Sequence, residues 1–248
     1  MAGHSKWSQI KRKKAANDQK RGQLFSKLGK EITVAAKMGG GDPELNPRLR
    51  TAIVAAKAES MPADNIDRAI KKGTGEIEGA NYEELTYEGY AAGGVAILVE
   101  TATDNKNRTA ADIRSIFSKN HGNMAGAGSV AWMFHKRSYF FVQGSDEDTV
   151  LEATIEAEPD DVKSSSDGVE IVGQFENFDK IDSALKEAGL NPKSANVTFI
   201  PENTVEIKDE GIARQILLLI EKLEDCDDVQ NVHTNFDISD EIMAKISN

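Results

Sequence analysis

The hydrophobic pattern of this chain changes at about residue 73, and this change constrains the fold more than any single motif. Before it, apolar residues recur at helical spacing, as in 18–38, where they form one face of an amphipathic helix. After it, short apolar runs of strand length alternate with helical segments. We therefore expect an α+β multidomain protein, in which an N-terminal helical bundle precedes two α/β (ferredoxin-like) domains.

Three helices are expected in the first 72 residues. The glycine run 39–41 should end the first helix. Asn46-Pro47 predicts an N-cap followed by proline in the first turn of the second helix. Met61-Pro62 opens a third helix, which Gly73 is expected to stop. The helices should pack as a small bundle with their basic residues facing outward.

The remainder of the chain reads as strands and helices in alternation. The run 95–103 is almost continuously apolar, which predicts a central strand. The other expected strands are 85–90, 129–135, 139–142, one near Val162, 169–175, 196–200, 204–207 and 229–236. The expected helices are 107–120, 146–158, 178–188 and 211–223.

The order of these elements predicts the domain organisation. The series from 139 to 200 has the βαββαβ order of a ferredoxin-like split βαβ unit. The tail alone has too few strands for a core, so it should return to the sheet that begins at Leu85. The expected domains are therefore 1–77, a discontinuous 78–135 plus 203–248, and 136–202 as the third domain inserted into the second.

Charge is distributed unevenly along the chain. Residues 1–72 contain 16 Lys and Arg against 7 Asp and Glu, a net charge of +9, whereas residues 73–248 carry −20. A basic head on an acidic body can bind a polyanion at one end while the rest stays soluble. The expected partner is nucleic acid, either duplex DNA or ribosomal RNA and tRNA, and the ribosome is a further candidate.

A basic run at the N-terminus, continued on the first long helix, is the leading candidate site. Its cations would neutralise phosphates, and an aromatic among them could stack on a base. The alternative is a solvated helix face on which Trp7 packs against the bundle as a core residue or anchor. The candidate nucleic-acid-binding residues are His4, Lys6, Trp7, Lys11, Arg12, Lys13, Lys14, Lys20, Arg21, Lys27 and Lys30, with Lys37 extending the stripe.

The glycine-rich loop 121–129 is a second candidate contact, through Asn123, Met124, Gly128 and Ser129. Its glycines could let the backbone approach a phosphate or a base. It lacks the ending of a phosphate-binding P-loop, in which a lysine directly precedes a hydroxyl residue, and this argues against nucleotide hydrolysis. A plain turn that needs glycine dihedral angles is the favoured interpretation.

No catalytic, metal or cofactor site can be recognised in the sequence. The four histidines are scattered, and Cys226 lies among carboxylates that disfavour a thiolate. The longest apolar runs are far shorter than the ~20 residues that cross a bilayer. A single cysteine and the absence of a secretory signal at the start predict a cytoplasmic protein. We expect no enzyme activity, no membrane partner and no small-molecule substrate.

The opening Gly3-His4-Ser5-Lys6-Trp7 with Ile10-Lys11 is the most specific of several motifs, distributed over the whole chain, that resemble the YebC/PmpR family, which includes a mitochondrial translational activator. The other matches are Lys14, Asp18, Arg21-Gly22, Phe25, Lys27, Ile32, Met61-Pro62, Asn65-Ile66, Ala69-Ile70, Gly73, 87–90, Gly93, Asn105, Arg108-Thr109, Gly122-Asn123 and 128–130. Met124-Ala125 departs from the Leu-Gly that most members carry.

The resemblance implies three domains, with the third inserted into the second, and a non-enzymatic role in gene expression. Members are described as promoter-binding transcriptional regulators or as ribosome-associated translation factors that relieve stalling. Segment 62–72 offers few side chains for bidentate base reading, which favours structured RNA or shape recognition on physical grounds. A protein-interaction adaptor, docking through its acidic domains, is the remaining alternative.

Overall fold

The computed structural model describes residues 18–165 and 167–247. The chain forms two compact units, one of which is the continuous segment 133–202. The other contains the residues before 133 together with those from 203 onward. Helices and antiparallel sheets make up both units, so the fold is of the mixed α/β type.

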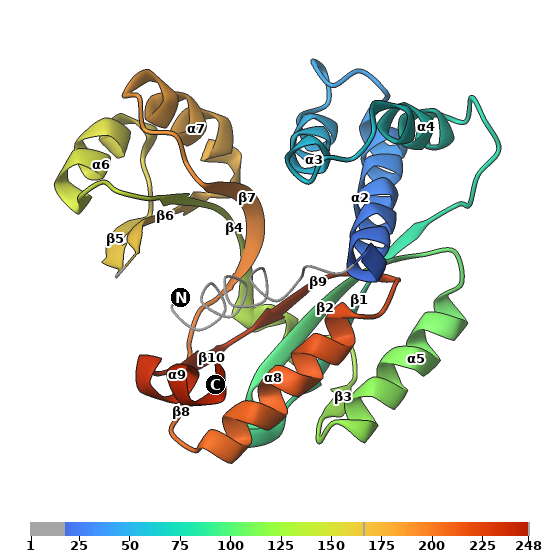
Figure 1. Ribbon diagram of the computed structural model, residues 1–248, viewed down its shortest axis with the longest axis vertical. Helices are drawn as coiled ribbons and strands as arrows, with labels where there is room; N and C mark the ends of the chain where they lie inside the picture. The colour runs from blue at the N-terminus through green and yellow to red at the C-terminus, as the bar shows by residue number, and fades with distance from the viewer. Residues whose placement is uncertain (1–17, 166, 248) are drawn as a thin grey trace. The chain divides into compact units, whose positions relative to one another are not determined.

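The first unit begins with three helices that share a hydrophobic core: α2 (Asp18–Gly39), α3 (Pro47–Ala58) and α4 (Ala63–Thr74) (Figure 1). Ile32, Leu49 and Ile66 are among its buried residues. As predicted, Asn46 caps α3: its side chain accepts the Leu49 N–H at 3.1 Å, ahead of Pro47.

Gly73 does not end α4, contrary to the sequence prediction. The helix continues to Thr74, and Gly75 caps it in the left-handed conformation at φ 80°. Gly73 instead lies where α4 meets α2, and a Cβ there would be only 2.4 Å from the carbonyl oxygen of Thr33. The missing side chain therefore allows the two helix backbones to touch.

A four-stranded antiparallel sheet follows the helices, in the order β3-β1-β2-β9. Its strands are β1 (Glu83–Tyr90), β2 (Ala96–Thr103), β3 (Asn123–Ala125) and β9 (Val229–Thr234). The predicted apolar strand, β2, is an interior strand and is buried along nearly its whole length. Helices α5 (Lys106–Lys119) and α8 (Glu210–Glu224) contribute Phe117 and Leu219 to the core beneath it (Figure 1).

Segments from the end of the chain complete this unit. Strand β9 pairs with β2, which is the predicted return of the tail to the first sheet. Strands β8 (Val205–Ile207) and β10 (Phe236–Ile238) form a small parallel pair, and α9 (Asp240–Ser247) follows. A short 3-10 helix, Ala92–Gly94, connects β1 to β2.

The strand predicted over 129–135 is wrong. A 3-10 helix, Ala131–Met133, occupies three of its seven residues, and strand structure begins only at Phe134. One long strand, β4 (Phe134–Val142), then replaces the two separate strands that the sequence suggested. The charged residues 135–137 interrupt the alternation of apolar and polar residues, so the sequence pattern does not show that the strand is continuous.

The second unit contains β4, α6 (Glu147–Thr154), β5 (Asp161–Ser165), β6 (Gly168–Gln174), α7 (Phe178–Glu187) and β7 (Ser194–Pro201). This is the predicted βαββαβ order, with short 3-10 helices at Ile155–Ala157 and Phe175–Asn177. The sheet order is β5-β6-β4-β7 and every pair is antiparallel. Phe140 stacks on Phe178 in its core at 4.9 Å between ring centroids.

Candidate nucleic-acid interface

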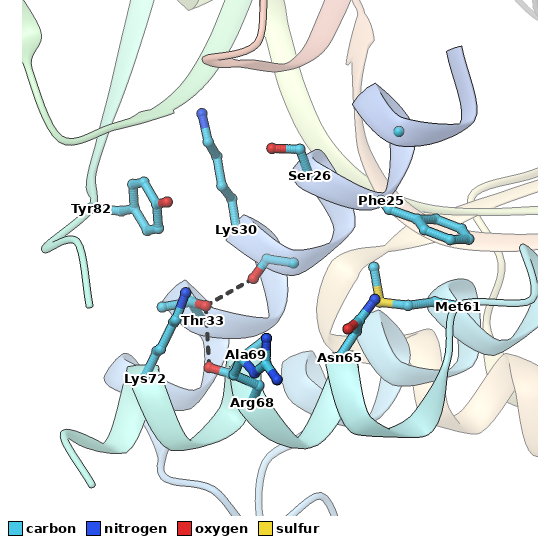
Figure 2. A pocket seen from close by; sticks show the side chains of 12 residues that line it. Phe25, Ser26, Lys30, Thr33, Met61, Asn65, Arg68, Ala69, Lys72 and Tyr82 are labelled. Atoms are coloured by element: carbon cyan, nitrogen blue, oxygen red, sulfur yellow. Dashed lines mark hydrogen bonds between the residues drawn. The ribbon is translucent and has the colours of Figure 1, made fainter. Parts of the chain in front are cut away.

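A groove of about 340 Å³ runs between α2 and α4 (Figure 2). Helix α4 lines it with Asn65, Arg68 and Lys72, which share one face because their spacing is three and four residues. All three are exposed. None of the lining residues within the described chain is acidic. The groove therefore presents positive charge without an internal counter-charge.

The α2 wall of the groove is made largely of small residues. Gly22, Ser26 and Gly29 recur at helical spacing along it. A Cβ built on Gly22 or Gly29 would have nothing within 4 Å, so the wall is open at both positions. The Thr33 hydroxyl donates to the carbonyl oxygens of Gly29 and Ala69, at 2.8 and 3.1 Å, and joins the helices at the end of the groove.

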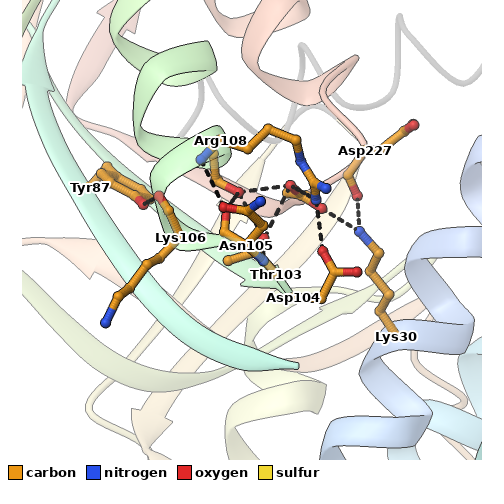
Figure 3. Close-up of polar contacts among 10 residues, drawn as sticks. Lys30, Tyr87, Thr103, Asp104, Asn105, Lys106, Arg108 and Asp227 are labelled. Carbon is orange, nitrogen blue, oxygen red and sulfur yellow. Dashed lines mark hydrogen bonds and ion pairs between the residues drawn. The ribbon is translucent and has the colours of Figure 1, made fainter. Parts of the chain in front are cut away.

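The predicted lysine stripe along α2 does not form a free cationic surface. Lys30 is only 9% exposed, and its ammonium group contacts Asp228 Oδ1 at 2.7 Å and the Asp227 carbonyl at 2.8 Å (Figure 3). Lys27 is half-buried and donates to the Glu224 carbonyl. The phosphate contact expected of Lys30 is therefore wrong, because its charge is already compensated by a buried carboxylate.

Asp228 is the centre of that arrangement. Its Oδ2 accepts hydrogen bonds from Thr109 at 2.7 Å, Arg108 at 3.0 Å and Thr103 at 3.2 Å. Burial alone would raise the pKa of this carboxyl, but the bonds from Lys30, Thr109 and Arg108 outweigh it and lower the pKa to about 2. The carboxylate therefore joins α2 to strand β2, helix α5 and the start of β9.

The remaining predicted contacts of the basic run lie either on α2 or outside the described residues. Arg21 is exposed, with its guanidinium 5.5 Å from the centre of the Phe25 ring. Lys20 is on α2. The predicted contacts that lie outside the described residues are His4, Lys6, Trp7, Lys11, Arg12, Lys13 and Lys14.

The second predicted contact, the loop 121–129, is organised by Glu88. Its carboxylate accepts the backbone N–H groups of Gly128 and Val130, both at 2.6 Å, and of Ala131 at 2.8 Å. Burial by itself would raise the pKa of Glu88, but these bonds outweigh it and lower the pKa. An internal anion thus already occupies the amides that could have received a phosphate.

Other parts of that loop are paired or exposed. Asn123 and Met124 belong to the edge strand β3, opposite Tyr90 and Gly89. The Ser129 carbonyl accepts from the Tyr90 hydroxyl at 3.1 Å and from the Trp132 indole at 3.2 Å. Trp132 is 63% exposed, so the loop offers an aromatic surface rather than free backbone amides.

The part of the chain that the structure describes lacks two other kinds of site. It contains no group of three or more His, Cys, Asp and Glu side chains placed to hold a metal ion. It also contains no helix long and apolar enough to cross a membrane.

Comparison with known proteins identifies the family. Residues 5–76 match the domain described as "TACO1/YebC protein N-terminal domain", and residues 82–236 match "TACO1/YebC second and third domain". The chain belongs to the TACO1/YebC family. The resemblance drawn from the sequence motifs is thereby confirmed.

Curated relatives match this chain over its whole length or very nearly so. A protein of Desulfatibacillum aliphaticivorans is 56% identical over 99% of this chain and 100% of its own length. One of Syntrophus aciditrophicus is 55% identical over 100% of both. Each is named "Probable transcriptional regulatory protein". A crystal structure of a conserved hypothetical protein from Aquifex aeolicus is similar at a TM-score of 0.82, with 44% identity over 91% of this chain and 94% of that one.

The sequence analysis missed Asn65, Arg68 and Lys72 as site residues. Their spacing on one helical face was readable in the sequence. The acidic neighbours Asp64 and Asp67 concealed the pattern, because they cancel the charge in a linear count. The structure separates them: neither acid lines the groove.

Proposed function

We propose that this TACO1/YebC protein is a non-enzymatic regulator of gene expression that binds nucleic acid through its basic N-terminal helical region. The observation that carries the proposal is the groove between α2 and α4, where Arg68 and Lys72 are exposed and no lining residue in the described chain is acidic. Such unpaired cations bind phosphates. The relatives' regulatory names support the same role.

Duplex DNA is the first candidate partner, because the curated relatives are named as transcriptional regulators. In this proposal Arg21, Arg68 and Lys72 bind phosphates together with the basic run 6–14 and Lys20. Lys27 and Lys30 are left out, since both ammonium groups are engaged with residues 224–228. Contacts of this kind position a protein on its target without reading the sequence.

Structured RNA, such as ribosomal RNA or tRNA, is the second candidate, and the geometry of α4 favours it. A recognition helix must project into the major groove of a duplex. Here the polar face of α4 instead lines a groove against α2. Unstacked bases and folded strands fit such a groove better than a duplex edge does.

Sedimentation of cell lysate through a sucrose gradient tests the proposal. The wild type is compared with a Lys11/Lys13/Lys14→Glu variant and with Lys106/Arg114/Lys119→Glu on α5 as a control of equal charge change. Wild type and control travelling with ribosomes, while the first variant stays at the top, would select the translation role. All three staying at the top, with only wild type and control shifting duplex DNA, would select transcription.

The same experiment contains the outcome that contradicts the proposal. If the Lys11/Lys13/Lys14→Glu variant keeps its ribosomal position or its DNA shift, the basic run is incidental. A retained ribosomal position would then make the acidic part of the chain the docking surface of an interaction adaptor, whereas a retained DNA shift would leave Arg68 and Lys72 as the phosphate contacts. Circular dichroism of each variant establishes that the fold is retained.

A further inference from the structure

The groove between α2 and α4 is a concave site, which phosphate binding alone does not require. An exposed lysine on a convex surface is enough for a phosphate contact. This groove encloses about 340 Å³. That volume is at the lower end of small-molecule sites, which run from about 300 to 1,000 Å³. The space is suited to a compact group that enters from the surface.

The floor of the groove is apolar. Met61 and Ala69 are buried there, and Phe25 is half-buried beside them. Figure 2 shows Phe25 and Met61 at one end of the groove and Tyr82 at the other. A flat aromatic group could lie on this floor by the stacking and dispersion contacts that hold unpaired bases on proteins.

The rim supplies the polar chemistry. Arg68 and Lys72 lie one helical turn apart and have no ion pair among the described residues. Asn65 precedes them on the same face, and its amide both donates and accepts hydrogen bonds, as the edge of a base does. A group with an aromatic ring and an attached anion matches this combination of floor and rim.

The open glycine wall gives such a group room to enter. Any side chain larger than a methyl group at Gly22 or Gly29 would project from the small-residue face of α2 into the groove. Glycine in a helix interior costs up to about 1 kcal/mol relative to alanine, so these two positions weaken α2. The opening that they provide is a physical reason to have glycine there.

We propose that this groove receives a single unpaired nucleotide of a nucleic-acid strand. The base would lie on Phe25 and Met61 with its edge toward Asn65, and the phosphate would be bound by Arg68 and Lys72. The inference rests on the proposed nucleic-acid function and deepens it, because it states which feature of the partner is recognised. An acidic peptide would need an aromatic side chain next to its carboxylates to match the floor and the rim, whereas every nucleotide joins a flat ring to an anion.

The test compares two RNA hairpins that differ by one bulged nucleotide, with the fluorescent base 2-aminopurine at the bulge. The full-length wild type should bind the bulged hairpin about tenfold more tightly, the order expected for one stacked base, and should change its fluorescence. Gly29→Leu fills the groove without altering charge. It should lose the preference yet still bind the paired hairpin. Ala55→Leu, on the exposed surface of α3, should behave as wild type.

Three results would overturn the inference, and they separate it from the function on which it rests. Equal wild-type affinity for both hairpins overturns the nucleotide pocket and leaves nucleic-acid binding intact. A Gly29→Leu variant that keeps the preference also overturns it. Binding of neither hairpin at low salt overturns the pocket and the proposed function together.

Three further arms refine the assignment. If circular dichroism shows that Gly29→Leu is unfolded, Arg68→Gln takes its place and Lys57→Gln serves as the control. Loss of the preference for the bulged hairpin in Arg68→Gln supports the pocket, and a retained preference overturns it. A free mononucleotide that competes as well as the bulged hairpin would overturn the assignment to a strand. The same bulge in a DNA hairpin shows whether the 2′-hydroxyl contributes: an equal preference there supports recognition by base and phosphate alone.

Discussion

At the residue scale, Asp228 explains why a lysine that looks like a nucleic-acid contact is structural. Its side chain is 9% exposed and compensates the buried charge of Lys30 while also bonding Arg108 and Thr109. Isolated surface ion pairs contribute little to stability. A buried charge that loses its partner is costly, and this pair is buried. A lysine on α2 can therefore either form a structural ion pair or bind a phosphate, and Lys30 forms the ion pair.

Asp228→Asn is expected to destabilise the protein by about 3 kcal/mol, because Lys30 keeps its charge without a buried counter-ion. Urea unfolding of the full-length chain measures the change. Asp104→Asn is the matched control, since Asp104 is exposed and its side chain bonds, among the described residues, only to the same arginine, Arg108, at 2.9 Å. An equal effect of the two substitutions would contradict the account.

The pKa of Asp228 also predicts how this stabilisation depends on pH. A carboxyl whose pKa is about 2 in the folded state, against about 3.9 when unfolded, stabilises the fold by about 2–3 kcal/mol at neutral pH. That stabilisation is complete above the unfolded pKa and is lost as pH falls from about 4 toward 2. The difference in unfolding free energy between wild type and Asp228→Asn should shrink over this range, and a constant difference would contradict the assignment.

Glu88→Gln tests the second residue-scale feature, the anchoring of the loop. A glutamine offers one oxygen, and its amide nitrogen would oppose backbone donors from Gly128, Val130 or Ala131. We expect a loss of about 2 kcal/mol, since bonds to a charged acceptor contribute about 1.5–3 kcal/mol. Hydrogen exchange should show faster exchange at those three amides, and unchanged protection there would contradict the role.

At the element scale, the helical region was predictable where local chemistry decides it. Asn46 and Pro47 fix the start of α3 through neighbouring atoms, and the apolar run of β2 fixes an interior strand. Gly73 was misread because its role depends on a helix 40 residues earlier. The pairing of Lys30 with Asp228 spans 198 residues, so no local pattern could reveal it.

Paired glycine substitutions test the close crossing of α2 and α4. Gly73→Ala places a methyl group 2.4 Å from the Thr33 carbonyl oxygen, so the helices must separate and stability should fall by about 1–3 kcal/mol. Gly29→Ala meets nothing within 4 Å and should stabilise by up to about 1 kcal/mol. Thermal unfolding compares them, and a shared direction of change would contradict the packing argument.

At the scale of the whole molecule, the N-terminal region is still the basic part of the chain. Fewer of its cations are available to a partner than the sequence suggests, because some form ion pairs within the fold. Lys30 is buried on Asp228, and Arg48 is held by Glu31 at 2.7 Å and Glu84 at 2.6 Å. The Lys30–Asp228 and Arg48–Glu84 pairs join the helical region to the α/β part of the same unit, whereas the Arg48–Glu31 pair joins α3 to α2. The cations that remain for a partner include Arg68, Lys71 and Lys72, all exposed on α4.

The most direct test of nucleic-acid binding by this region is a salt titration of affinity. Wild type, Arg21/Arg68/Lys72→Gln and the α5 control Lys106/Arg114/Lys119→Gln are each titrated with labelled duplex DNA and with labelled hairpin RNA. Removing three phosphate contacts should weaken binding and reduce the slope of log affinity against log salt by about 3 on DNA, or about 2 if the bound RNA is single-stranded. The control should keep the wild-type slope. A wild-type slope near zero, or equal losses in the two variants, would contradict the account.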